Sequence, residues 1–203
     1  MSNHYVIITG GECKTERLSS TITEHAFVIA ADSGYDTANK LGIVPDLLVG
    51  DMDSIKEVPS GVEVCRVKAE KDDTDTMLAV SIAKSRGADE ITVIGGAGGR
   101  ADHWLSNIFL LEALDAEGIR AELCDGVNVI CVVSNRSVTI PQNDGYFGLL
   151  ALEDSIVTAT GCKYPLDSAL ITRSNPYAVS NEVVGDAANV SVKGKLILTV
   201  SRK

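Results

Sequence analysis

The sequence has no long apolar run and no cluster of basic residues. No apolar segment approaches the roughly 20 residues that a membrane-spanning helix needs, so we expect no membrane span. The chain has 28 acidic against 18 basic residues and a formal charge of -10. Its longest basic cluster is the C-terminal Ser-Arg-Lys. This balance disfavours binding to nucleic acid or to an anionic membrane surface.

The chain also lacks closely spaced cysteines and a leader. Its five cysteines are an odd number and contain no Cys-x-x-Cys pair, which argues against a zinc knuckle and against a disulfide framework. The N-terminus opens directly with the strand-like pattern Tyr-Val-Ile-Ile-Thr, without a basic segment and a cleavage site. We therefore expect a cytoplasmic protein.

The first part of the chain has the pattern of an α/β fold. The 203 residues are 45% hydrophobic, which suffices for one large core or two modest ones. Short β-branched runs alternate with amphipathic segments, as in a parallel sheet with crossover helices. We expect strands at 5–9, 27–31, 47–49, 63–67 and 91–94, and helices at 36–41, 74–86 and 102–117, the last two ending at Gly87 and Gly118.

The pattern changes after about Asp125. Helical periodicity disappears, and short β-rich runs follow one another, with Lys193-Gly194 as a hairpin turn. These runs predict a small antiparallel sandwich or barrel. The expected architecture is an α/β domain with a mostly parallel sheet over residues 1–125, and an all-β domain over residues 126–203.

Two aspartates stand one residue apart at the end of a buried strand. The segment Pro-Asp-Leu-Leu-Val-Gly-Asp-Met-Asp ends with Asp51 and Asp53, and alternate residues of an extended chain point the same way. Ligands bind at the carboxyl ends of the strands in open α/β sheets. Converging carboxylates suit Mg²⁺, which accepts one or two of them together with substrate phosphates. The plainer alternative is a surface turn with solvated aspartates.

Two further acidic stretches favour the metal over the turn. Asp32 follows the second expected strand and faces the same edge of the sheet. Lys71, Asp72, Asp73, Thr74 and Asp75 crowd the start of a helix. Capping by Thr74 or Asp73 and the helix dipole explain one or two of these acids. The others indicate a nearby cation.

A glycine-rich loop joins the fifth expected strand to the third helix. Glycines let backbone amides approach an anion, and the start of the following helix adds a partial positive charge. An arginine here can bind phosphate through two hydrogen bonds. A mobile turn capped by Asp102 is the plainer alternative. The residues that would form this site are Gly95, Gly96, Gly98, Gly99, Arg100, Asp102 and His103, with Asn107 one turn further along the helix.

The same loop matches a dinucleotide-binding fingerprint. Gly96, Gly98 and Ala101 have its spacing, and Glu122 could be the ribose partner. That fingerprint normally follows the first strand of its domain, whereas this loop follows about the fifth, which argues against it. A P-loop is excluded because no Gly-Lys-Ser/Thr follows the glycines.

Taken in order, these motifs resemble the bacterial thiamine pyrophosphokinase family. They are Ala-Asp-Ser-Gly, the segment ending in Asp51-Met-Asp53, Lys-Asp-Asp-Thr-Asp, and the segment Gly-Gly-Ala-Gly-Gly-Arg-Ala-Asp-His. Gly-Cys-Lys-Tyr-Pro-Leu-Asp and Ser-Asn-Glu-Val-Val-Gly extend the likeness into the C-terminal part. The resemblance implies an α/β domain, a β-sandwich and a homodimer whose active sites lie between subunits.

The resemblance also implies a reaction and its residues. The family transfers the pyrophosphoryl group of ATP to the hydroxyl group of thiamine, giving thiamine diphosphate and AMP. Metal and phosphate positions correspond to Asp32, Asp51, Asp53, Asp75, Arg100 and Asp102, and the thiamine-contacting pair corresponds to Ser180 and Asn181, contributed by the partner subunit.

The residues suggest how the reaction would proceed. Asp51, Asp53 and Asp75 would hold Mg²⁺, while Lys71, Arg100 and the glycine amides would bind the remaining phosphate oxygens. Asp72 or Asp102 could be the base for the thiamine hydroxyl, and His103 an orienting donor. We expect the sole tryptophan, Trp104, to lie in the core.

Two other functions fit part of the sequence. A metal-dependent nucleotide-sugar transferase would use Asp51 and Asp53 but leave the later motifs without a role. A non-catalytic sensor of nucleotide or thiamine would bind its ligand without forming product.

Overall fold

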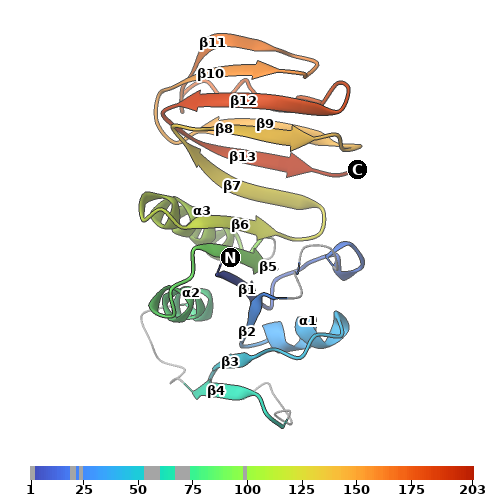
Figure 1. Cartoon of the computed structure of the whole chain (residues 1–203), viewed down its shortest axis with the longest axis vertical. Coiled ribbons are helices and arrows are strands. Elements are labelled where there is room, and N and C mark those ends of the chain that lie inside the picture. Colours follow the sequence, from blue (N-terminus) through green and yellow to red (C-terminus); the bar gives the residue numbers. More distant parts are fainter. Residues whose placement is uncertain (1–2, 19–21, 23–24, 53–59, 67–73, 98–99) are drawn as a thin grey trace. The chain divides into compact units, whose positions relative to one another are not determined.

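The chain forms two compact units in the computed structural model, Met1–Gly126 and Val127–Lys203. The structure describes residues 3–18, 22, 25–52, 60–66, 74–97 and 100–203. Figure 1 shows helices and strands in the first unit, and strands in the second.

The first unit contains a parallel sheet. Its strands lie side by side in the order β4-β3-β2-β1-β5-β6, and every neighbouring pair is parallel. All five expected strands are present, and the sixth, β6, was not predicted. The bounds are β1 His4–Ile8, β2 Phe27–Ala31, β3 Leu47–Gly50, β4 Glu63–Arg66, β5 Glu90–Ile94 and β6 Arg120–Cys124.

Among its described residues, this unit also has three helices and a short 3-10 turn. They are α1 Gly34–Lys40, α2 Asp75–Ser85, α3 Ala101–Ala116 and η1 Thr15–Arg17. Thr74 caps α2, as predicted, because its hydroxyl oxygen accepts a hydrogen bond from the backbone N–H of Met77 at 3.2 Å. Gly87 and Gly118 follow α2 and α3 with φ of 83° and 80°, which confirms the two left-handed helix ends.

The central strands are buried on both faces. All four residues of β3 are buried, and so are the last four residues of β1, β2 and β5. This explains why these segments read as continuous apolar runs in the sequence rather than as alternating patterns. This core fixes the positions of the strand ends, and so of the residues that directly follow β1, β2 and β5.

The second unit is a sandwich of two antiparallel sheets. One sheet has the order β7-β13-β9 and the other β11-β10-β12-β8. The hairpin predicted at Lys193-Gly194 is wrong, because β12 and β13 do not pair with each other: β12 lies between β10 and β8, and β13 lies between β7 and β9. At Gly194, whose φ is 116°, the chain passes from one sheet to the other. The bounds are β7 Asn128–Ser134, β8 Ser137–Pro141, β9 Tyr146–Ala151, β10 Ser155–Thr160, β11 Leu166–Ile171, β12 Ala187–Lys193 and β13 Lys195–Ser201.

A single apolar core joins the two sheets of this sandwich. Phe147 and Leu198 contribute from one sheet, and Val157, Ile171 and Val190 from the other. The expected fold class is therefore confirmed in both of its parts.

The exposure of the tryptophan differs from the prediction. Trp104 was predicted to lie in the core, but 36% of it is exposed on α3, so that prediction is wrong. Its neighbours Leu105 and Phe109 are also exposed. The core contact of α3 is made instead by a different stripe, which includes Ile108, Leu111 and Leu114.

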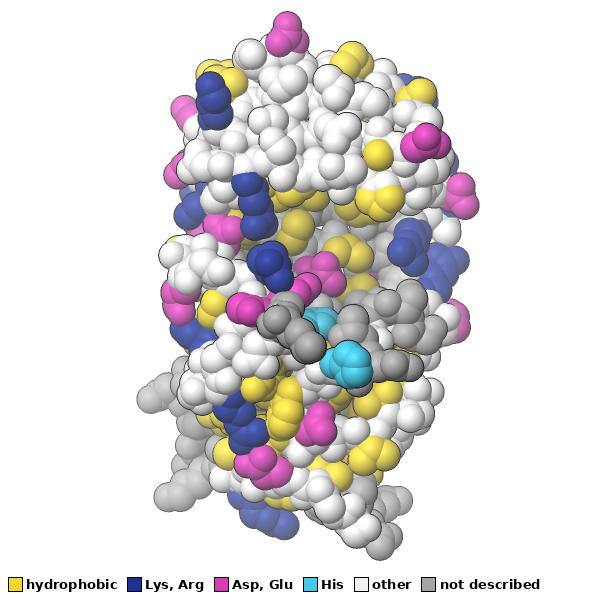
Figure 2. Space-filling view, viewed as in Figure 1, with side chains coloured by type: hydrophobic (Ala, Val, Ile, Leu, Met, Phe, Trp, Pro, Cys, Tyr) yellow, Lys and Arg dark blue, Asp and Glu magenta, His cyan; other side chains and the backbone are white. Residues whose placement is uncertain are grey.

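Charged side chains of both signs share the face of the molecule drawn in Figure 2. Lysine and arginine side chains lie interspersed with aspartate and glutamate on this face. Within the part of the chain that the structure describes, no helix is long and apolar enough to cross a membrane. All five cysteines are free thiols, and Cys124 and Cys162 are buried.

The carboxyl group of Glu122 is hydrogen-bonded to a neighbouring strand of the parallel sheet. Glu122 on β6 is half-buried and accepts a hydrogen bond from the Thr92 hydroxyl at 3.3 Å, and that hydroxyl is 3.0 Å from the His4 ring nitrogen Nε2. Burial raises the pKa of the Glu122 carboxyl, which the Thr92 hydrogen bond partly opposes. The folded protein therefore ionises Glu122 less readily than the unfolded chain does.

This shift predicts that Glu122→Gln stabilises the protein in a pH-dependent way. The contribution of wild-type Glu122 is largest below the ordinary glutamate pKa of about 4.3 and is lost as pH rises through the raised folded value. Glutamine cannot ionise, so the variant should gain stability over wild type as pH rises above the ordinary glutamate pKa of about 4.3, and the gain should level off once the folded protein has ionised Glu122. Thermal unfolding at several pH values measures this. Glu153→Gln, at an exposed position, is the control, and an equal effect of Glu122→Gln at all pH values would contradict the prediction.

Candidate functional site

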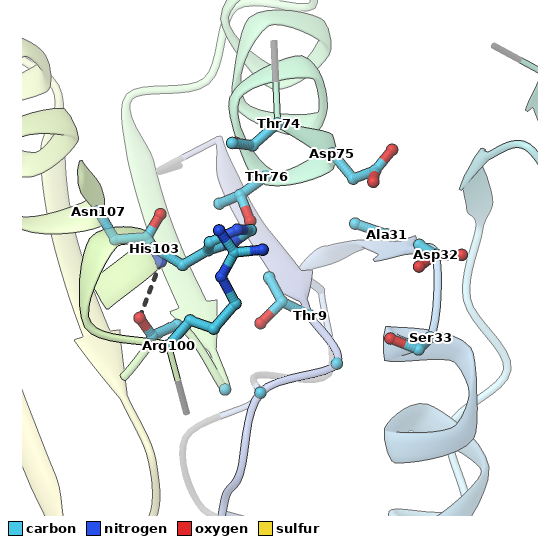
Figure 3. A pocket seen from close by; sticks show the side chains of 14 residues that line it. Thr9, Ala31, Asp32, Ser33, Thr74, Asp75, Thr76, Arg100, His103 and Asn107 are labelled. Carbon is cyan, nitrogen blue, oxygen red and sulfur yellow. Dashed lines mark hydrogen bonds between the residues drawn. The ribbon is translucent and has the colours of Figure 1, made fainter. Parts of the chain in front are cut away.

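A pocket of about 350 Å³ opens at the carboxyl ends of the parallel strands of the first unit (Figure 3). Parallel pairing places the residues after β1, β2 and β5 at one edge, and the starts of α2 and α3 lie at the same edge. The lining residues come from these five places: Thr9, Gly10 and Gly11; Ala31, Asp32 and Ser33; Gly95 and Gly96; Thr74, Asp75 and Thr76; and Arg100, His103 and Asn107.

Glycines allow the backbone segments of the pocket floor to touch. A Cβ on Gly11 would collide with the carbonyl oxygen of Gly95, and one on Gly10 would collide with the Ser33 hydroxyl. Gly95 has φ of 75°, and a Cβ there would lie 2.9 Å from the Thr9 carbonyl oxygen. These close approaches require glycine at all three positions and bring the segments after β1, β2 and β5 into contact at the pocket floor.

Two carboxylates lie in the pocket, on Asp32 and Asp75. Asp32 follows β2 and continues its pairing with β3, since its backbone N–H donates to the Val49 carbonyl at 2.8 Å. It then turns with a left-handed φ of 48°, a conformation that costs free energy and is often found at functional sites. Asp75 is the first residue of α2. In the view of Figure 3 both lie on the opposite side of the pocket from Arg100 and His103.

The acidic pair after β3 begins beside Asp32. A Cβ on Gly50 would lie 3.3 Å from the Asp32 Cα, so Asp51 follows directly from a point where the two strand ends touch. Met52, between the two aspartates, has φ of 67° and packs its buried side chain against Ala30 and Leu48. Asp51 does not line the pocket. Asp53 lies outside the residues that the structure describes.

Arg100 lines the pocket and is held by an acid in the first turn of α3. Its guanidinium makes two hydrogen bonds to the Asp102 carboxylate, at 2.6 Å and 3.1 Å, and both side chains are exposed. Hydrogen bonds from Arg100 hold the pKa of Asp102 below its ordinary value, and the His103 backbone N–H adds to this. Asp102 is the second residue of α3 and not its cap, because Arg100 takes that position.

Asn107 connects α3 to the glycine loop. Its side chain is buried and donates a hydrogen bond to the Gly96 carbonyl at 2.8 Å, the dashed line in Figure 3. His103, one turn earlier, also lines the pocket. Both residues therefore lie on one helix face, as their spacing predicted. Gly98, Gly99, Lys71 and Asp72 lie outside the described residues.

The position of Glu122 argues against a dinucleotide site. It lies within β6, half-buried and hydrogen-bonded to Thr92, and it does not line the pocket. A ribose partner would have to reach the carboxyl edge of the sheet.

The donors of the pocket suit a hard divalent cation. Asp32 and Asp75 supply carboxylate oxygens, and Thr9 and Thr76 bring hydroxyl groups to the same pocket. Mg²⁺ prefers oxygen donors and keeps several waters when few carboxylates bind it. Among the described residues, which exclude Asp53, no three His, Cys, Asp or Glu side chains form a metal-binding cluster. The chemistry of the site fits a cation that substrate oxygens help to bind.

A second pocket, of about 470 Å³, lies in the β-sandwich. It contains Ser180, which is exposed and has a left-handed φ of 59°, and Asn181, which is only 6% exposed. Aromatic and aliphatic side chains form the rest of the lining: Tyr164, Leu166, Tyr177, Ala178 and Val179.

Sequence reasoning missed part of the first pocket. Thr9, Gly10 and Gly11 directly follow β1, and the two adjacent glycines were a signal that this strand end also approaches a ligand. Thr76 and Ser33 gave no such signal, because hydroxyl residues near helix starts are ordinary.

Comparison with known proteins gave matches in both units. The family model described as "Thiamin pyrophosphokinase, catalytic domain" matches residues 18–123, and that of the "vitamin B1 binding domain" matches residues 137–197. Thiamine pyrophosphokinase of Bacillus subtilis is 34% identical over an alignment of 192 residues, and the match covers 89% of this chain and 90% of that protein.

Solved structures match over nearly the whole chain. The crystal structure of the Bacillus subtilis thiamine pyrophosphokinase has a TM-score of 0.87 and 31% identity, and the match covers 98% of this chain and 99% of that one. The Candida albicans enzyme has a TM-score of 0.80 at 16% identity, with 100% and 90% covered, and at that identity it supports the fold alone.

The close backbone contacts of the pocket floor predict a difference between two glycine variants. Gly95 and Gly118 have similar φ, 75° and 80°, but a Cβ on Gly118 would meet nothing within 4 Å. Gly118→Ala should cost about 1 kcal/mol of unfolding free energy, from backbone strain alone. Gly95→Ala should cost about 3 kcal/mol, because its methyl group also presses on the Thr9 and Gly11 carbonyls. Urea unfolding measures both, and equal losses would contradict the close approach.

Proposed function

The chain belongs to the thiamine pyrophosphokinase family, and we propose that it transfers the pyrophosphoryl group of ATP to the hydroxyl group of thiamine, giving thiamine diphosphate and AMP. The resemblance of its motifs to this family is confirmed by family models that match both units. The nucleotide-sugar transferase and the non-catalytic sensor are not favoured by these matches.

The observation that carries the proposal is the pocket at the sheet edge. It combines carboxylates, an arginine and glycine backbone in one cavity, where a polyphosphate needs a cation, a guanidinium and amide donors. We assign the triphosphate of ATP to this pocket. Arg100, Lys71 and the amides of Gly96, Gly98 and Gly99 would bind its oxygens, and Asp32 would lie beside the nucleotide.

Asp51, Asp53 and Asp75 are our proposed Mg²⁺ ligands. A bound Mg²⁺ would neutralise phosphate charge as the thiamine oxygen approaches the β-phosphorus. The support is that Asp75 lines the pocket and that Asp51 follows the strand end that touches Asp32.

The proton of the thiamine hydroxyl needs an acceptor, for which we proposed Asp72 or Asp102. While Arg100 binds Asp102, the lowered pKa of that carboxyl makes it a weak base. If phosphate takes over the guanidinium, Asp102 loses those hydrogen bonds and becomes more basic. His103 would orient the phosphates by donating a hydrogen bond.

We assign thiamine to the pocket of the β-sandwich, at Ser180 and Asn181. We further propose a cytoplasmic homodimer in which this pocket of one subunit serves the ATP pocket of the other. The support for the shared site is that the pocket with charged and glycine lining lies in the first unit, and the pocket with aromatic and aliphatic lining lies in the second. The support for the cytoplasm is that none of the five cysteines is in a disulfide.

The proposed metal role predicts that Asp75→Asn lowers kcat about 10²- to 10³-fold, because the change keeps the shape of the side chain but removes its charge. The assay incubates protein with ATP, thiamine and Mg²⁺ and separates AMP from ADP. EDTA should abolish AMP formation, and added Mg²⁺ should restore it.

Asp154→Asn, at an exposed position of the second unit, is the matched control and should retain full activity. Wild-type rates in Asp75→Asn would refute the metal assignment. Formation of ADP, or no nucleotide product from the wild-type protein, would refute the function.

The shared site predicts complementation between two inactive variants. Asp75→Asn impairs one pocket, and Ser180→Trp, which fills the other, should also be inactive by itself. A co-expressed heterodimer would contain one site with both pockets intact and should regain activity, measured as AMP formed by doubly tagged, purified dimers. If each site lay within one subunit, the heterodimer would have no intact site and would stay inactive.

A further inference from the structure

We propose that Asn181 is a positioning residue whose side chain holds Tyr164 at the rim of the sandwich pocket, so that Tyr164 and Ser180 face thiamine while the Asn181 amide does not. This inference rests on the proposed function and departs from the expectation that Ser180 and Asn181 both contact the substrate.

The Asn181 side chain is bound to the backbone on both of its polar atoms. Its oxygen accepts hydrogen bonds from the backbone N–H groups of Tyr164, at 3.0 Å, and Glu182, at 2.9 Å. Its Nδ2 donates to the Tyr164 carbonyl at 2.8 Å. The side chain thus binds both the N–H and the carbonyl of one residue, as a neighbouring strand would.

Burial separates the roles of the three residues. Asn181 is 6% exposed, whereas Tyr164 is 57% exposed and Ser180 is exposed as well. An amide oxygen has two lone pairs, and both Asn181 acceptor positions are in use. The oxygen therefore has no acceptor position left for a ligand in the pocket, and one of the two Nδ2 hydrogens is used by the Tyr164 carbonyl.

Other contacts also join the segment 162–164 to the segment 181–182. The Cys162 thiol donates to the Tyr164 carbonyl at 3.6 Å, and the Lys163 ammonium pairs with the Glu182 carboxylate at 2.6 Å. The backbone N–H of Lys163 donates to the Glu182 carbonyl at 2.9 Å. Residues 162–164 are thus fixed to residues 181–182, and Asn181 is the member that fixes Tyr164 itself.

The pocket offers a wall for a flat cationic ligand. The rings of Tyr164 and Tyr177 line it together with Leu166 and Val179, and aromatic faces attract cations and stack on flat rings. The Lys163 ammonium already lies 5.6 Å from the Tyr164 ring centroid. Ser180, with its left-handed backbone, adds a hydroxyl group.

Kinetics of single variants test the assignment. Tyr164→Leu and Asn181→Ala should each raise KM for thiamine about tenfold, with kcat and KM for ATP unchanged. Asn189→Ala removes an amide that accepts a hydrogen bond from Thr139 elsewhere in the same unit; it is the matched control and should leave every constant at the wild-type value. A KM for thiamine within twofold of wild type in Tyr164→Leu would overturn the proposal.

A double-variant cycle distinguishes positioning from contact. If Asn181 acts through Tyr164, adding Asn181→Ala to Tyr164→Leu should change KM for thiamine little further, whereas independent contacts would multiply the two effects. Multiplied effects would overturn the proposal.

If Asn181→Ala does not fold, Asn181→Asp also distinguishes positioning from direct contact. It keeps both accepted hydrogen bonds but replaces the donor to Tyr164 with an oxygen. Positioning predicts a raised KM for thiamine, while direct contact with the cationic ring predicts a lowered one, because a carboxylate would attract it.

Failure of this inference is separable from failure of the proposed function. If the wild-type protein forms AMP but the variants behave as wild type, the function stands and the inference falls. If it forms no AMP, calorimetric titration of the same variants with thiamine alone decides the inference, and absence of thiamine binding to wild type overturns both.

Discussion

The parallel pairing of β1 with β2 and β5 is the constraint on which the pocket at the sheet edge depends. It brings three strand ends to one edge, where the glycines after β1 and β5 let their backbones touch. The starts of α2 and α3 complete that edge with Asp75 and Arg100. A shift in the register of one of these strands would move the residues that follow it away from the rest of the pocket.

Much of this arrangement could be predicted from the sequence. Short β-branched runs predicted five of the six strands that the structure describes in the first unit. Thr74 marked the start of α2, and Gly87 and Gly118 marked the ends of α2 and α3, because these signals are local. The strand β6 has no such signal: Arg120 and Glu122 interrupt its apolar character. Its place depends on pairing with β5 and on the Thr92 hydroxyl that accommodates Glu122, both of which are non-local.

The side-chain roles were harder to predict than their places. Asp32, Asp75, Arg100 and His103 were expected at one edge and line one pocket. The sequence could not tell that Asn181 binds the backbone of Tyr164, 17 residues away, or that Trp104 is exposed while its neighbours on another face of α3 form the core. Such roles are set by which face of an element meets a partner, and residue type alone does not determine that.

Charge balance links the two halves of the nucleotide site. The pocket brings together two carboxylates and Arg100, and the guanidinium of Arg100 is already hydrogen-bonded to the Asp102 carboxylate. A polyphosphate entering such a site meets like charge unless positive charge enters with it or Arg100 exchanges partners. Divalent cation and nucleotide are therefore expected to bind together. The Arg100–Asp102 pair then has a second consequence, since a phosphate that binds Arg100 in place of Asp102 would also remove the hydrogen bonds that lower the pKa of the Asp102 carboxyl.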